Sequence, residues 1–253
     1  MKIIKILIIT VSCIFAEDNL RTIHILVPLC NSEHDGMVSV STGCDYNKPE
    51  TNLFWGAIYG IKTFFKADVN NWEHIQDIQY QGSHILERSI FKHKKQNVTL
   101  IADAYNGKML DVALIDFYQS LDGTKKENFL LLDWDFEIDV DIYGSSDLII
   151  FVGQHKDIEY QFNSKTKSDI ETMILTCFSQ LNFCDAVSNT SAIPLLLTTN
   201  AIAPEAYSIK GALDVWINNR DSKEILDEAS IQYNNYQNCG IKAAKSLFTT
   251  SCP

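Results

Sequence analysis

The sequence predicts an α/β protein with a mostly parallel sheet and helices on both faces. Unbroken β-branched and aliphatic runs at 147–152 and 171–176 are typical of strands that are buried on both sides. The connection between these two runs is too long for a hairpin and indicates a crossover between parallel neighbours. Apolar runs alternate with segments of helical spacing along the chain, which favours this fold class over an all-α or all-β fold.

Short apolar runs bounded by polar turns define the strands that we predict. In chain order they cover residues 24–29, 98–102, 147–152, 171–176 and 193–198. Residues 73–91 fit either a helix or strands. Residues 128–143 are acidic and aromatic, and alternating carboxylates there predict an edge strand with a solvated acidic face. That face would carry Asp133, Asp135, Glu137, Asp139 and Asp141. Calcium binding is the alternative for this face, although no calcium-loop pattern is present.

Helical spacing and turn signals define the predicted helices. They cover residues 53–66, 108–121, 165–170, 204–218, 223–236 and 241–248. Asn52 is expected to cap the first of them, and Pro204 suits the first turn of the fourth.

The chain has 253 residues and a net charge of −11, with 46% hydrophobic residues. This length and composition fit one globular domain, which we place at residues 17–253. The strong negative charge argues against nucleic acid and anionic membrane surfaces as partners.

Residues 1–16 have the order of a secretory signal peptide. Lys2 and Lys5 precede an apolar stretch that ends at Ala16, and a polar segment follows. Removal of this segment changes the net charge to −11 − 2 = −13. A lipid-attachment site at Cys13 is the alternative, although Thr10 fits that pattern poorly. No other run reaches the ~20 apolar residues of a membrane span, so we expect a secreted or periplasmic protein.

Six cysteines remain after residue 16, and an exported chain favours disulfides among them. Two local pairings suggest themselves, Cys30 with Cys44 and Cys239 with Cys252. Six cysteines allow about 15 complete pairings, and the sequence alone does not choose between them.

Two potentially reactive side chains follow the buried runs 147–152 and 171–176. His155 follows the first run and Cys177 follows the second. Because the carboxyl ends of parallel neighbours meet at one edge, these two side chains are a candidate base and nucleophile. A disulfide between Cys177 and Cys184, with no catalysis, is the rival interpretation.

Residues 147–184 resemble the caspase–hemoglobinase class of cysteine peptidases, in which a histidine follows one buried strand and a cysteine follows the next. The resemblance implies a caspase-like three-layer sandwich and hydrolysis of peptide bonds, with Cys177 as nucleophile and His155 as base. Backbone amides near Gly153 would then stabilise the oxyanion. Gln154 stands where the class has histidine, and the segment 155–177 is short. A catalytically inactive binding or structural protein is therefore the alternative.

Two further stretches, 52–60 and 203–207, resemble an uncharacterised bacterial family, which implies no activity. Asp103 ends a predicted strand and is a candidate acid for orienting a histidine, although a turn or cap role is the alternative. No zinc motif or phosphate-binding glycine-rich loop occurs, so we predict no metal and no cofactor. The expected partner is a peptide or protein substrate or ligand.

Overall fold

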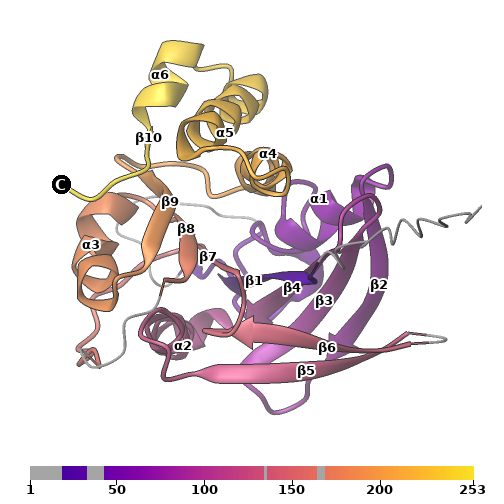
Figure 1. The fold of residues 1–253 in the computed structure, drawn as a ribbon. Helices are drawn as coiled ribbons and strands as arrows, with labels where there is room; N and C mark the ends of the chain where they lie inside the picture. Colours follow the sequence, from indigo (N-terminus) through magenta and orange to yellow (C-terminus); the bar gives the residue numbers. More distant parts are fainter. Residues whose placement is uncertain (1–18, 33–42, 134–135, 164–168) are drawn as a thin grey trace, which may run out of the picture.

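A computed structural model describes residues 19–32, 43–133, 136–163 and 169–253 (Figure 1). The expected signal segment at 1–16, with Cys13, lies outside the described residues. Most of the predicted helix at 165–170 lies outside them as well.

The fold is mixed α/β and is built on one eight-stranded, mostly parallel sheet, in the order β10-β9-β8-β7-β1-β4-β3-β2. The five parallel strands are β1 (Arg21–Pro28), β4 (Val98–Tyr105), β7 (Leu148–Val152), β8 (Glu171–Leu175) and β9 (Ile193–Thr198). All five predicted strands are therefore present. Numbered along the chain, these strands have the spatial order 2-1-3-4-5, which is a doubly wound order whose direction reverses between β1 and β7.

Antiparallel strands extend both ends of this parallel core. The segment whose state was ambiguous forms a hairpin of β2 (Trp72–Gln79) and β3 (Ile85–His93), which pairs with β4. The short β10 (Phe248–Thr249) pairs with β9 at the other end and begins at the last residue of the helix predicted at 241–248.

The described residues contain six α-helices. They are α1 (Ile61–Ala67), α2 (Leu110–Leu121), α3 (Ser179–Thr190), α4 (Ala206–Trp216), α5 (Ser222–Gln237) and α6 (Ile241–Ser246). Helix α3 was not predicted from the sequence, because its polar residues leave only a narrow apolar stripe on its buried side.

The two faces of the sheet carry separate hydrophobic clusters, and successive side chains of β1 point alternately into one cluster and the other. Ile23, Ile25 and Val27 pack on the face covered by α1, α4 and α5, which we call the α4 face. Leu26 packs on the opposite face, covered by α2 and α3, which we call the α2 face. The alternation follows from the period of two residues in a strand.

A second, two-stranded sheet also belongs to the α2 face. It is the hairpin of β5 (Lys126–Asp133) and β6 (Phe136–Tyr143). On β6, Glu137, Asp139 and Asp141 are exposed, whereas the intervening Val140 is buried. The alternation therefore produces a solvated acidic face along this part of β6; the side chains of Asp133 and Asp135 lie outside the description.

The predicted helix at 53–66 is wrong in its first half, because α1 begins only at Ile61. Residues 53–60 form turns that bring the backbone into close contact with itself. A Cβ atom on Gly56 would lie 2.3 Å from the carbonyl oxygen of Pro49, so only glycine fits there. Asn52 does not cap α1, whose N-cap residue is Gly60; its side chain bonds the backbone N–H and C=O of Cys30.

The described chain contains two disulfides. Cys30 pairs with Cys44, as suggested from the sequence, and Cys184 pairs with Cys252. The suggested bond between Cys239 and Cys252 is therefore wrong, and Cys177 is a free thiol, not the partner of Cys184. Within the described ranges, no helix has both the length and the apolar character that crossing a bilayer requires.

Candidate functional site

The carboxyl edge of the parallel sheet carries the segments that were predicted to be reactive. β7 and β8 are parallel neighbours, with Leu148 opposite Glu171 and Val152 opposite Leu175. The segments that contain His155 and Cys177 therefore leave the sheet at the same edge. This is the edge at which open α/β sheets usually bind their ligands.

Cys177 lies on the α4 face of this edge. Its Sγ atom lies 3.7 Å from the carbonyl oxygen of Ile202, which belongs to the hydrophobic cluster of that face. Burial raises the pKa of Tyr233, a residue of α5 on the same face, and the charges of Cys239, Glu205 and Cys177 add smaller contributions to that rise. The thiol is partly exposed.

The backbone after Cys177 turns sharply from strand into helix. Phe178 is left-handed, with φ of 54°, and its N–H donates to the carbonyl of Asn200. Helix α3 begins at the next residue. A left-handed conformation is costly for a residue with a large side chain, so the surrounding contacts must hold this turn in place.

His155 packs on the opposite, α2 face. Its ring meets Phe183 of α3 edge-on, at a centroid distance of 4.9 Å. Phe183 is fully buried in the hydrophobic cluster of that face. Burial lowers the pKa of His155, and the charge of Asp157 offsets only part of this effect. The imidazole is therefore neutral at neutral pH.

The structure thus brings His155 and Cys177 to one edge but leaves their side chains on different faces of the sheet. Among the described residues, no hydrogen bond or ion pair joins the two. A thiol needs a base or a positive charge beside it to become a reactive thiolate at neutral pH. In this arrangement, His155 provides neither a base nor a positive charge beside the Cys177 thiol.

Gly153, the candidate oxyanion donor, has a structural role in this arrangement. Its N–H donates to the carbonyl of Leu175 at 3.2 Å, so it extends the pairing of β7 with β8. Its φ is +148°, and a Cβ atom would lie 3.1 Å from the carbonyl oxygen of Pro28. The amide that would face an oxyanion is already used within the sheet.

Gln154 joins the two strands at which the strand order reverses. Its side-chain oxygen accepts the N–H of Asn31 at 3.1 Å, and its amide nitrogen donates to the carbonyl of Asn31 at 3.3 Å. The Cys30–Cys44 disulfide lies beside this contact in the chain. From the sequence, Gln154 was only a departure from the peptidase pattern, because no local signal identifies a partner 123 residues away.

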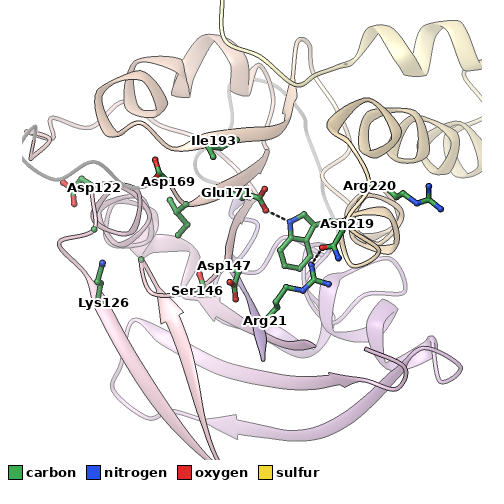
Figure 2. A pocket seen from close by; sticks show the side chains of 14 residues that line it. Arg21, Asp122, Lys126, Ser146, Asp147, Asp169, Glu171, Ile193, Asn219 and Arg220 are labelled. Carbon is green, nitrogen blue, oxygen red and sulfur yellow. Dashed lines mark hydrogen bonds between the residues drawn. The ribbon is translucent and has the colours of Figure 1, made fainter. Parts of the chain in front are cut away.

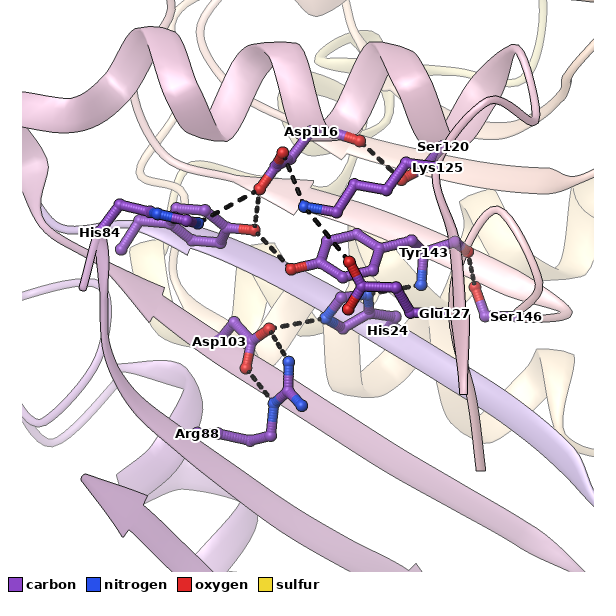
Figure 3. Close-up of polar contacts among 11 residues, drawn as sticks. His24, His84, Arg88, Asp103, Asp116, Ser120, Lys125, Glu127, Tyr143 and Ser146 are labelled. Atoms are coloured by element: carbon purple, nitrogen blue, oxygen red, sulfur yellow. Dashed lines mark hydrogen bonds and ion pairs between the residues drawn. The ribbon is translucent and has the colours of Figure 1, made fainter. Parts of the chain in front are cut away.

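Asp103 lies inside β4, not at its end, and its partners are residues that the sequence did not identify (Figure 3). Arg88 donates to both carboxylate oxygens, each at 2.7 Å, and Nε2 of His24 lies 3.0 Å from Oδ2. Burial raises the pKa of Asp103, but Arg88 and His24 outweigh it and hold that pKa well below its usual range. Asp103 therefore orients His24, a residue without solvent access, rather than His155.

Hydrogen bonds continue from this buried group to α2 and to the β5–β6 hairpin. The hydroxyls of Tyr143 and Tyr105 lie 3.3 Å apart, and Tyr105 donates to Asp116 at 2.9 Å. Lys125 pairs with Asp116 at 2.8 Å and closes the network near the surface (Figure 3). A fully bonded network of this kind fixes the position of the hairpin on the sheet, and it presents no open site to a ligand.

Within the described ranges, no group of three or more His, Cys, Asp or Glu side chains could hold a metal ion.

A cavity of about 780 Å³ lies at the opposite, amino-terminal edge of the sheet, where β1, β7, β8 and β9 begin (Figure 2). This cavity was not predicted from the sequence, in which the candidate reactive residues all pointed to the carboxyl edge.

Comparisons with family models, with curated proteins and with solved structures gave no match for this chain.

Proposed function

We propose that this chain is an exported binding protein for a peptide or protein ligand, with a caspase-like arrangement but without the catalytic chemistry of that class. One observation carries the proposal: the Cys177 thiol contacts Ile202 on the α4 face, whereas the His155 ring contacts Phe183 on the α2 face. A nucleophile and its base need contact within hydrogen-bond reach, or through one water molecule.

The residues between the two strands support the same proposal. Gln154, which stands where the resembling class has histidine, carries an amide, and an amide cannot accept a proton as a general base. Its side-chain oxygen accepts the N–H of Asn31, and its side-chain nitrogen donates to the carbonyl of Asn31. The amide of Gly153 is bonded within the sheet. The side chain of Gln154 and the amide of the candidate oxyanion donor Gly153 are therefore both used in contacts between strands of the sheet or the segments that follow them.

Export is supported by two features. Residues 1–16 have the pattern of a signal peptide, and the described chain contains two disulfides. Disulfides persist in oxidising compartments and are rare in the reducing cytosol. The strand order, with a cysteine and a histidine after neighbouring parallel strands, supports the resemblance to the caspase–hemoglobinase class.

Alkylation of the native protein by iodoacetamide tests the lack of catalytic chemistry. Cys239 is also a free thiol and is exposed, so it serves as an internal control in the same sample. We expect Cys177 to react no faster than Cys239, with a rate that His155→Ala leaves unchanged. Peptide mapping after timed quenching measures both rates. Fast, pH-dependent alkylation of Cys177 that His155→Ala slows would overturn the proposal.

A cysteine-dependent hydrolase of peptide bonds is the second candidate. It is favoured by the free, partly exposed Cys177 at the carboxyl edge, directly before the left-handed Phe178 and the start of α3. Strained turns of this kind are found at functional sites. The hydrolase predicts the opposite alkylation result, so the same experiment separates the two functions.

A further inference from the structure

The cavity at the amino-terminal edge has the size and the polar lining of a ligand site. Its volume of about 780 Å³ lies within the range of small-molecule sites in proteins. One wall is formed by the end of α4 and the residues that follow it, and the other by the turn between α2 and β5 (Figure 2). Asp147 and Glu171, at the starts of β7 and β8, lie between these walls.

The first wall is held in place by contacts to neutral groups. Arg21 stacks over the indole of Trp216, at 4.6 Å from the ring centroid, and donates to the side chain of Asn219 at 2.7 Å. It also donates to the carbonyl oxygen of Ile217. None of these partners carries a negative charge. The guanidinium is therefore fixed in position, and its charge is not neutralised within the described chain.

The carboxylates of the cavity are likewise bonded to neutral donors. Asp147 accepts the N–H of Thr22 through Oδ2, at 2.6 Å. Glu171 accepts the indole N–H of Trp216 through Oε2. The second oxygen of each carboxylate has no hydrogen-bond donor among the described residues. Lys126, on the far wall, has no carboxylate within ion-pair distance in the same part of the chain.

Charges of both signs therefore line one cavity without forming ion pairs with each other. Arg21 and Lys126 are positive groups of the lining, and Asp147 and Glu171 are negative ones. The carboxylates would repel a simple anion, and Arg21 would repel a simple cation. A ligand that carries both an ammonium and a carboxylate group satisfies both sets at once.

We propose that this cavity binds a zwitterionic ligand of amino-acid to short-peptide size, through its free ammonium and its free carboxylate. The ammonium group pairs with Asp147 and Glu171, and the carboxylate pairs with Arg21 or Lys126. The proposal gives the proposed binding function a ligand class. It does not depend on the reactivity of Cys177, which lies at the opposite edge of the sheet.

Three peptides that differ only at their termini test the proposal by isothermal titration calorimetry on the disulfide-bonded protein. Triglycine has both charges, N-acetyl-triglycine lacks the ammonium, and triglycine amide lacks the carboxylate. We expect triglycine to bind, and each blocked peptide to bind at least about tenfold more weakly, because each has lost one charged contact. Equal binding of all three peptides, or no binding of triglycine at about 10 mM, would overturn the proposal.

Two substitutions locate the binding in the cavity. Glu171→Gln and Asp147→Asn remove the charge but keep an oxygen that can accept the bonds from Trp216 and Thr22. Each is expected to weaken triglycine binding about tenfold, whereas the binding of N-acetyl-triglycine, which has no ammonium group, should not be weakened. Glu137→Gln, on the exposed face of β6, is the matched control and should bind as the unaltered protein does. Unchanged triglycine binding in both cavity variants would place the peptide elsewhere and refute the site.

Discussion

The imidazole of His24 accepts the backbone N–H of Tyr143 at Nδ1, at a distance of 2.9 Å. Tyr143 is left-handed, with φ of 57°, a conformation that costs a non-glycine residue about 1 kcal/mol or more. Because Nδ1 accepts this bond, the proton of the neutral ring lies on Nε2, which faces Asp103 at 3.0 Å. A buried histidine thus connects β1, β4 and the end of β6.

Acidification is expected to destabilise the protein through His24. Burial lowers the pKa of His24, and the bond to Asp103 only partly opposes this. The folded-state pKa is therefore below the unfolded value of about 6.5. The contribution of neutral His24 is complete above that value and is lost as the pH falls towards the folded-state pKa. Urea unfolding at about pH 7.5 and about pH 5.5 measures the loss.

The His24→Gln variant isolates this contribution, because glutamine does not titrate. We expect its free energy of unfolding to fall less between the two pH values than that of the unaltered protein. Burial also lowers the pKa of His93, but this side chain is partly exposed, so His93→Gln should change the pH dependence less. Equal pH dependence of His24→Gln and the unaltered protein would show that His24 is not the titrating group.

Removal of Arg88 is expected to leave an uncompensated charge in the core. Arg88 and Asp103 are 7% and 0% exposed and share two hydrogen bonds of 2.7 Å. The substitution Arg88→Met should cost about 3–5 kcal/mol of stability, measured by urea unfolding. Lys245→Met removes an ion pair with Asp227 that is 45% and 37% exposed, and should cost at most about 1 kcal/mol. Similar losses of stability in Arg88→Met and Lys245→Met would contradict the burial of the Arg88–Asp103 pair.

Gly153→Ala is expected to destabilise the junction of β1 and β7. The substitution combines an unfavourable φ of +148° with a Cβ atom 3.1 Å from the carbonyl oxygen of Pro28. A loss of about 1–3 kcal/mol is expected in chemical unfolding. Gly82 also has a positive φ, of +70°, but a Cβ atom there meets nothing within 4 Å. Gly82→Ala is the matched control, and a loss in Gly153→Ala no larger than in Gly82→Ala would argue against the close contact.

The Cys184–Cys252 disulfide is expected to contribute strongly to stability. It joins residues that are 68 positions apart and ties the end of the chain to α3. The chain-entropy argument gives a cost of about 4 kcal/mol for Cys252→Ala. Cys239→Ala, which removes an exposed free thiol, should change stability by less than about 0.5 kcal/mol. Thermal unfolding under non-reducing conditions measures both, and equal midpoints would mean that the disulfide does not form.

The parts of the fold that the sequence predicted correctly are those with a local signal. The run at 193–198 coincides with β9, and the helix predicted at 223–236 lies within α5. Apolar runs and helical periodicity are read from neighbouring residues, so no distant contact is needed to identify them. The segment 53–60 failed because its conformation depends on contacts with the backbone of Pro49 and Glu50, which periodicity does not show.

The sequence by itself determined that β7 and β8 are buried parallel neighbours, and therefore that His155 and Cys177 share an edge. Only the tertiary structure decided which face each side chain occupies, and which partners Asp103 and Gln154 bind. The physical reason is that side chains alternate between the two faces of the sheet only within a strand, and this alternation stops where the strand ends. Beyond it, the direction of a side chain depends on packing against elements such as α3 and the segment around Ile202, which lie far away in the sequence.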